Sequence, residues 1–251
     1  MKKVISSLIL FFLVAGVFAQ VKDSSKSSGF GGLLKKAGSV LNSSKSGSGS
    51  SLTSDEIIAG LKEALSLGAQ NSTGKLSTVD GFLKDAAVKI LMPEEVRKLE
   101  TKMRALGMGK LVDNAITSMN RAAEDASKTA SPIFINAIKK MSVQDALGIL
   151  KGKDTAATSY LKKATSNELT NAFRPIIESS LKKVNATKYW TEVFTVYNKF
   201  SLTPVNADIN EYVTERALRG IFFYVGEEEK KIRANPAARV SDILKKVFGS
   251  K

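Results

Sequence analysis

The sequence predicts an all-α protein, a single multi-helix bundle domain of eight or more helices that follows a signal peptide and a flexible linker. From residue 53 onward, apolar residues recur at helical spacing, and no stretch of useful length alternates between apolar and polar residues as a strand does. Helix-capping residues and isolated glycines or prolines separate these apolar segments. We therefore assign residues 1–19 to the signal peptide, 20–53 to the linker and 54–251 to the helical domain.

The amino terminus has the composition of a secretory signal. Lys2 and Lys3 precede an apolar run from Val4 to about Val14, and the sequence VFA stands before Gln20. The run is shorter than the roughly 20 residues that a membrane-spanning helix needs, and its basic start and small-residue end are typical of a cleaved signal peptide. The sequence thus predicts export, with the mature protein in the periplasm or associated with the cell envelope.

The predicted linker is rich in serine and glycine, a composition typical of a flexible tether. A basic amphipathic island, FGGLLKKAGSVL, interrupts it at residues 30–41. Such a segment can lie on a membrane surface. The alternative is a disordered or self-docking segment, because isolated helices shorter than about 12–15 residues are marginal. The candidate membrane-surface residues are Phe30, Leu33, Leu34, Lys35 and Lys36.

The first part of the domain contains two predicted helix starts. Thr53 and Glu56 have the spacing of a capping box, in which each side chain accepts a hydrogen bond from the other residue's backbone. A loop at residues 71–82 and a part-helical, part-extended segment at 83–93 follow. Pro93 suits the first turn of the next helix, with two glutamates behind it at the positive end of the helix.

Glycines 107 and 109 break the chain before a long helix predicted from about Lys110 to Thr129. The remaining predicted helices are 132–141, one opened by Ser142, one opened by Asp154, one interrupted at Pro175, 187–200, a long helix from about Ala207 to Ala234, and a closing helix capped by Ser241.

The chain contains no cysteine and no histidine, which excludes several classes of site. Without cysteine there is no disulfide framework, thiolate nucleophile or cysteine-bound zinc. Without histidine there is no Ser-His-Asp triad, no histidine-bound metal and no general base of the usual kind near neutral pH. No catalytic motif is recognisable, so the sequence favours a protein that is not an enzyme, and we expect no metal and no cofactor.

Carboxylate pairs are the remaining enzymatic route, as acid and base or as metal ligands. The pair Glu94 and Glu95 is explained as negative charge in the first turn of the helix predicted to begin at Pro93. In GEEEKKIR, lysine or arginine follows a glutamate by four residues, at Glu227–Lys231 and Glu229–Arg233, which predicts a solvated helix face. The candidate acids are Glu94 with Glu95, Glu124 with Asp125, and Glu227 to Glu229.

The run SMNRAAEDASKTA concentrates charge on the predicted helix 110–129. At about 100° per residue, Arg121, Glu124 and Asp125 fall opposite the apolar stripe of that helix. One interpretation is a solvated face with a weak Arg121–Asp125 pair. Alternatively, a second layer covers the helix, and Arg121 and Glu124 form a buried structural network or a ligand site. The candidate ligand-binding residues are Arg121, Glu124 and Asn120, the last at the edge of the stripe.

Aromatic residues are concentrated late in the chain and are predicted to belong to the core, with a lipid-sized pocket as the alternative. They are Tyr189, Trp190, Phe194, Tyr197, Phe200, Phe222, Phe223 and Tyr224.

Several long stretches resemble a known family, among them LGMGKLVDNAITSMNRAAEDA, PIFINAIKKMSVQDALGILKGKDTAATSYLKKATSNEL and EEEKKIRANPAARVSDILKKVFG. The family is the bacterial one catalogued as domain of unknown function 4197, and the resemblance covers roughly Leu52 to Gly249. It implies an exported, mostly helical domain, chiefly from Gram-negative organisms. It implies no activity and no functional residues.

The net charge of +14 favours anionic partners over neutral ones, with solubility as the alternative explanation. After export these partners are envelope lipids or polymers, or another envelope protein, rather than nucleic acid. The leading hypothesis is a non-enzymatic binding or scaffolding module of the envelope. A carrier of a hydrophobic ligand and a carboxylate-based enzyme are the alternatives.

Overall fold

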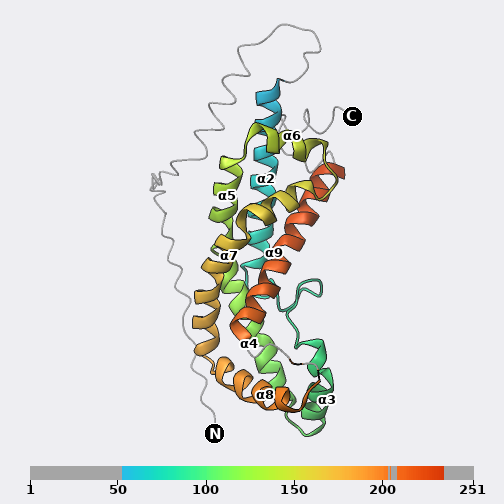
Figure 1. Cartoon of the computed structure of the whole chain (residues 1–251), viewed down its shortest axis with the longest axis vertical. Coiled ribbons are helices and arrows are strands. Elements are labelled where there is room, and N and C mark those ends of the chain that lie inside the picture. The colour runs from blue at the N-terminus through green and yellow to red at the C-terminus, as the bar shows by residue number, and fades with distance from the viewer. Residues whose placement is uncertain (1–52, 203, 205–207, 235–251) are drawn as a thin grey trace, which may run out of the picture. The chain divides into compact units, whose positions relative to one another are not determined.

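The computed structural model of the chain describes residues 53–202, 204 and 208–234 (Figure 1). The predicted signal peptide, the predicted linker with its basic amphipathic island (except Thr53), and the closing helix predicted at Ser241 lie outside the described residues. The chain divides into two units, Met1–Ser50 and Ser51–Lys251, and every described helix belongs to the second.

The described residues contain eight α-helices and one short 3-10 helix, and no strand occurs among them, so the all-α prediction is confirmed. None of these helices has the length and apolar content needed to cross a lipid bilayer. In chain order they are α2 (Ser54–Leu76), η1 (Glu94–Val96), α3 (Arg97–Ala105), α4 (Gly109–Ser127), α5 (Ala130–Lys140), α6 (Val143–Lys151), α7 (Ala156–Lys182), α8 (Ala186–Phe200) and α9 (Ile209–Ala234).

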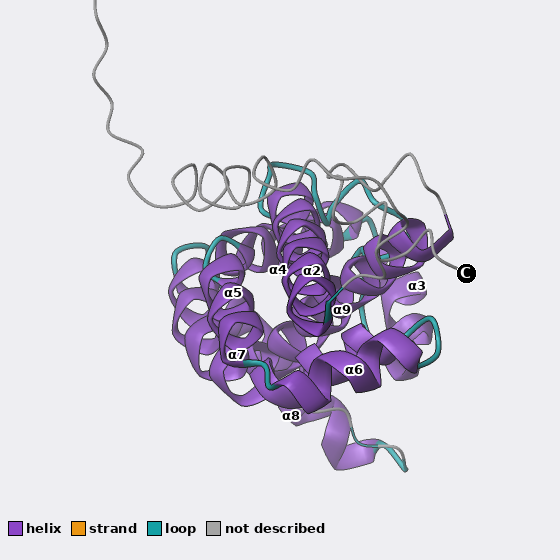
Figure 2. Ribbon diagram, turned by 90° about the horizontal axis from the view of Figure 1, so that it is seen from above, coloured by secondary structure: helices purple, strands orange, loops and turns teal. Residues whose placement is uncertain are grey.

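The core lies between the long helices. α7 packs extensively against α4, α5 and α9, and α2 packs against α5 and α9. Seen from above in Figure 2, α2 lies between α5 and α9. Phe134 of α5 meets Phe222 of α9 edge to face, with ring centroids 5.8 Å apart. α3 and α8 lie at the end of the bundle opposite α6 (Figure 1).

Local capping signals place two helix starts as predicted. The Thr53 hydroxyl accepts a hydrogen bond from the Glu56 amide, and the Glu56 carboxylate accepts one from the Thr53 amide. Ser142 and Asp145 form the same reciprocal pair at the start of α6. Gly107 adopts a φ of +80° between α3 and α4, a conformation that favours glycine.

Two predicted interruptions are absent. α2 continues through the first half of the loop predicted at residues 71–82. The buried Ser72 and Thr73 hydroxyls donate to carbonyls one turn earlier, which satisfies these polar groups inside the helix. α7 runs unbroken past Pro175. Both Pro175 and Asn171 are exposed, so water can reach the Asn171 carbonyl that loses its amide donor.

Candidate functional site

Residues 77–92, here the connecting segment, join α2 to η1 through turns and extended backbone. Their apolar side chains Phe82, Val88 and Ile90 are nevertheless buried. A Cβ added to Gly220 of α9 would lie 2.6 Å from Cε1 of Phe82, so the missing side chain makes room for this ring. The connecting segment is therefore part of the core, and its backbone polar groups need partners there.

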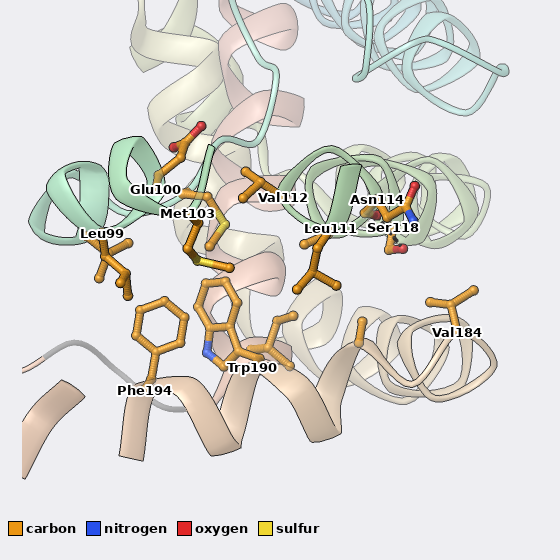
Figure 3. Close-up of a pocket in the computed structure, with 15 residues that line it drawn as sticks. Leu99, Glu100, Met103, Leu111, Val112, Asn114, Ser118, Val184, Trp190 and Phe194 are labelled. Atoms are coloured by element: carbon orange, nitrogen blue, oxygen red, sulfur yellow. Dashed lines mark hydrogen bonds between the residues drawn. The ribbon is translucent and has the colours of Figure 1, made fainter. Parts of the chain in front are cut away.

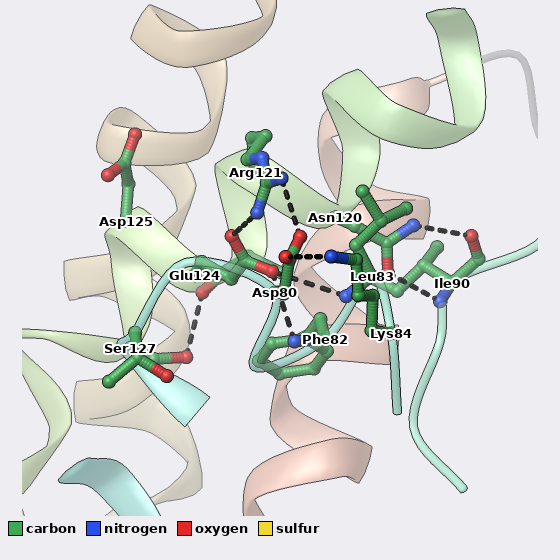
Figure 4. Close-up of polar contacts among 12 residues, drawn as sticks. Asp80, Phe82, Leu83, Lys84, Ile90, Asn120, Arg121, Glu124, Asp125 and Ser127 are labelled. Atoms are coloured by element: carbon green, nitrogen blue, oxygen red, sulfur yellow. Dashed lines mark hydrogen bonds and ion pairs between the residues drawn. The ribbon is translucent and has the colours of Figure 1, made fainter. Parts of the chain in front are cut away.

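Two polar side chains of α4 supply those partners (Figure 4). The Glu124 carboxylate accepts hydrogen bonds from the amides of Phe82 at 3.1 Å and Leu83 at 3.2 Å. Asn120 accepts a hydrogen bond from the Ile90 amide at 2.8 Å and donates one to the Ile90 carbonyl, also at 2.8 Å. Glu124 is only 3% exposed and Asn120 is fully buried.

Arg121 lies at the solvent-exposed edge of the cluster that Asn120 and Glu124 form with the connecting segment. Its guanidinium donates to Glu124 at 2.6 Å and to Asp80 of the connecting segment at 2.7 Å. The hydrogen bonds to Glu124 and then to Asp80 raise the pKa of Arg121, and hydrogen bonds from Lys84 and Arg121 lower the pKa of Asp80. Both residues are therefore held in their charged forms.

The solvated-face interpretation is wrong for Glu124, because the connecting segment covers that side of α4. The predicted Arg121–Asp125 pair is also wrong. Asp125 points away from the cluster (Figure 4), pairs with Lys128 at 2.8 Å and accepts a hydrogen bond from the Ser180 hydroxyl at 3.2 Å. A helical wheel shows where a helix has its own apolar stripe, but not whether another segment covers the opposite side.

A second polar cluster fastens the connecting segment to α2 and α9. The Asp85 carboxylate accepts a hydrogen bond from the Tyr224 hydroxyl at 2.5 Å and pairs with Lys75 at 2.8 Å. Burial opposes the charged form of Asp85, but hydrogen bonds from Lys75, Tyr224 and the Ala87 amide outweigh it and lower the pKa of this carboxyl. The side chain is thus a charged anchor between two helices.

The structure brings Asn120, Arg121 and Glu124 together as one cluster, and their polar atoms bind the protein's own backbone and Asp80. Their role as ligand-binding residues stays a prediction. The observed geometry gives them a structural task, which is to hold residues 80–90 against α4.

The candidate acids Glu227 to Glu229 include both exposed and buried residues. Glu227 pairs with Lys230 rather than with the predicted Lys231. Glu229 does pair with Arg233, but it is 6% exposed, so the solvated-face prediction is wrong for it. Within the described ranges, no cluster of three or more acidic side chains is arranged to hold a metal ion.

Glu229 is buried because it caps α7 from another helix. Its carboxylate accepts hydrogen bonds from the amides of Ala157 at 3.0 Å and Thr158 at 2.8 Å, and from the Thr158 hydroxyl at 2.7 Å. The predicted cap of this helix, Asp154, is one residue early, and the observed N-cap Thr155 makes no side-chain capping bond. A carboxylate here also suits the positive end of the α7 dipole.

An apolar pocket of about 170 Å³ lies between α3, α4 and α8 (Figure 3). α3 packs mainly on α4, and α8 packs mainly on α7 and α9, so the two helices leave a space between them. Trp190 and Phe194 point from α8 into this space. The residues lining it are Met92, Val96, Leu99, Glu100, Met103, Leu111, Val112, Asn114, Ala115, Ser118, Val184, Ala186, Trp190, Phe194 and Ile209.

Trp190 and Phe194 form an aromatic wall of the pocket, and Tyr212 stacks on Trp190 from outside the lining. The Trp190 ring lies 4.3 Å from the Phe194 ring and 5.5 Å from the Tyr212 ring, in each case between centroids. Tyr212 in turn donates a hydrogen bond from its hydroxyl to the Leu91 carbonyl at 2.8 Å. Burial raises the pKa of Tyr212, so the hydroxyl keeps its proton for this bond.

Of the late aromatic residues, Trp190, Phe194 and Phe222 are buried as predicted, whereas Phe223 is exposed. The α3 and α4 walls of the pocket were missed by sequence reasoning. Leu111 of the LGMGKL turn is an apolar residue that lines the pocket, and its presence beside the two glycines is the signal that the sequence contains.

A family model with the description "Protein of unknown function (DUF4197)" matches residues 51–249, in agreement with the resemblance found in the sequence. Comparison with curated proteins and with solved structures gave no match. No functional residue is therefore transferred from a relative, and the geometry alone has to indicate what the domain does.

Proposed function

Because the chain belongs to the DUF4197 family of proteins of unknown function, we propose a function from its geometry: a non-enzymatic domain of the cell envelope whose apolar pocket holds the hydrocarbon part of a ligand. The observation that carries this proposal is the pocket between α3, α4 and α8. Small-molecule sites are typically concave and mostly apolar, with a few polar groups that orient the ligand.

The size of the pocket limits what it can hold. An apolar cavity of about 150 Å³ in another protein is large enough for benzene. The volume of about 170 Å³ between α3, α4 and α8 thus has room for a group of about six carbon atoms. A short alkyl chain, or one end of a longer chain, matches this space.

The lining favours such a group over a polar one. Trp190 is 4% exposed and presents its ring to the pocket. Glu100 is the one acid among the lining residues, and it pairs with Arg104 at 3.0 Å. Two further lining residues, Leu111 and Val184, are exposed to solvent at the rim. Exposed apolar groups that continue into a pocket are typical of a binding surface.

The envelope location rests on the composition of residues 1–19, which is typical of a cleaved signal peptide. Protein isolated from the envelope fraction of its own cells is expected to begin at Gln20 by amino-terminal sequencing. A mature chain that retains Met1, or protein found in the cytoplasmic fraction alone, contradicts this part of the proposal.

Occupation of the pocket can be followed through Trp190, the single tryptophan of the chain. Octanol is expected to bind and to change the Trp190 fluorescence in a saturable way. Ala115→Phe, which places a ring in the pocket from α4, is expected to weaken octanol binding about tenfold, because displacing two methylene groups costs about 1.6 kcal/mol.

The matched control is Thr117→Phe, on the same helix at an exposed position outside the pocket lining. It is expected to bind octanol as the unmodified protein does. Far-ultraviolet circular dichroism establishes that both variants keep their helices. Equal octanol affinity in the two variants, or no saturable response in the unmodified protein, rules out the pocket as the binding site.

A further inference from the structure

A basic groove lies beside the apolar pocket, between residues 87–97 and α9. Its cationic residues are Lys89, Arg97, Arg216 and Arg219, and Glu94 is the one acid among the residues that line it. Glu94 pairs with Arg97 at 2.9 Å. The groove therefore carries a clear excess of positive charge.

The other cations of the groove have no acidic partner in the described part of the chain. Lys89, Arg216 and Arg219 form no ion pair there, although the other groups of the connecting segment and α9 are extensively paired. Arg216 lies 5.1 Å from the Tyr212 ring, which orients its guanidinium at the edge of the groove. Like charges gathered on low-dielectric walls attract an anion from solution.

The groove and the apolar pocket adjoin each other. Met92 lines both. Tyr212 lines the groove and stacks on Trp190, which lines the pocket. Ile209 of the pocket and Tyr212 of the groove are three residues apart on α9, so they lie on one side of the helix. A ligand whose hydrocarbon chain occupies the apolar pocket therefore has its polar end beside the basic groove.

We propose that the ligand is an anionic amphiphile, with its hydrocarbon chain in the apolar pocket and a phosphate or carboxylate headgroup in the basic groove. This inference rests on the proposed function, since it assigns the polar end of the same ligand. Guanidinium groups bind both kinds of headgroup through paired hydrogen bonds, and Arg219 and Arg216 offer two of them. Lys89 adds a third positive charge from the connecting segment.

The test compares two ligands that share one chain. Octyl phosphate, used below its critical micelle concentration, is expected to bind about tenfold more tightly than octanol, because a charge-assisted hydrogen bond contributes about that factor. In the double variant Lys89→Gln/Arg219→Gln, octyl phosphate is expected to lose most of this advantage. Octanol binding is expected to stay unchanged, because neither residue lines the apolar pocket.

The matched control removes two charges of the same sign nearby. Lys98 and Lys102 of α3 are exposed and line neither site, so Lys98→Gln/Lys102→Gln is expected to keep the tenfold preference. Inorganic phosphate, which lacks the chain, is expected to displace octyl phosphate only at a concentration at least tenfold higher. Ala115→Phe is expected to weaken octyl phosphate binding as it weakens octanol binding.

The outcomes separate the two proposals. Equal affinity for octyl phosphate and octanol, or a preference that survives in Lys89→Gln/Arg219→Gln, overturns the headgroup assignment and leaves the apolar pocket standing. Displacement by inorganic phosphate at equal concentration, or octyl phosphate binding that Ala115→Phe does not affect, shows a site for free anions and also overturns the amphiphile. Failure of octanol to bind at all contradicts the proposed function itself.

Discussion

Replacing Glu124 by alanine is expected to lower the free energy of unfolding by about 3 kcal/mol, since it leaves two backbone amides and a guanidinium without their acceptor. The amides are those of Phe82 and Leu83, and the guanidinium is that of Arg121. In a domain of this size, a loss of that magnitude corresponds to a drop in melting temperature of roughly 6–12 °C. Urea denaturation and thermal unfolding of the variant measure it.

The neighbouring residue provides the control. Asp125 is charged and lies next in the chain, but it is half-exposed and pairs with Lys128 at the surface. Asp125→Ala is therefore expected to cost no more than about 1 kcal/mol. Glu124→Gln keeps an acceptor for the two amides and is expected to fall between the two variants. If Glu124→Ala is as stable as Asp125→Ala, the carboxylate does not hold the connecting segment.

Replacing Glu229 by alanine is expected to have an effect of similar size, about 3 kcal/mol, through a different helix. The substitution removes the cap that α9 provides for the first turn of α7. It also breaks the ion pair between Glu229 and Arg233, whose side chain is 13% exposed. Thermal unfolding measures the loss, and hydrogen exchange at the amides of Ala157 and Thr158 locates it.

Glu227, two positions before Glu229 on α9, is the control, because it is an exposed glutamate on the same helix. Glu227 is exposed and pairs with Lys230 at the surface, so Glu227→Ala is expected to change stability by no more than about 0.5 kcal/mol. Faster exchange at Ala157 and Thr158 is expected for Glu229→Ala alone. A result in which both variants lose the same stability makes Glu229 an ordinary surface charge and contradicts its role as a cap.

The parts of the fold that depend on neighbours in sequence could be predicted. The capping box at Thr53 and the helix start at Ser142 are specified within four residues, and both are confirmed. The helix from Gly109 to Ser127 agrees with its predicted limits to within two residues. These features follow from backbone hydrogen bonds that the local sequence itself satisfies.

The parts that depend on distant segments could not be predicted from helical periodicity. The charged run around Glu229 predicts a solvated face, and the helical wheel leaves both a solvated face and a buried network open for Glu124. In the structure, each is covered by a segment more than 40 residues away and binds its backbone. The backbone amides of residues 82–83 and 157–158 need acceptors because they have no backbone partner. The sequence does not show that Glu124 and Glu229 supply those acceptors.

The basic groove illustrates a signal that the sequence does contain. Tyr212, Arg216, Arg219 and Phe223 recur at intervals of four, three and four residues, which places them on one side of a helix. That spacing predicts a shared face of α9, but not that Lys89 of the connecting segment faces it. Proximity between segments more than 120 residues apart comes only from the tertiary structure.

The anchoring of the connecting segment also bears on the order in which the chain folds. The bond from Phe82 to Glu124 joins residues 42 apart, and the bond from Tyr224 to Asp85 joins residues 139 apart. Closing such loops carries an entropic cost that helix formation within α2, α4 or α9 does not. We therefore expect docking of this segment to follow helix formation within α2, α4 and α9.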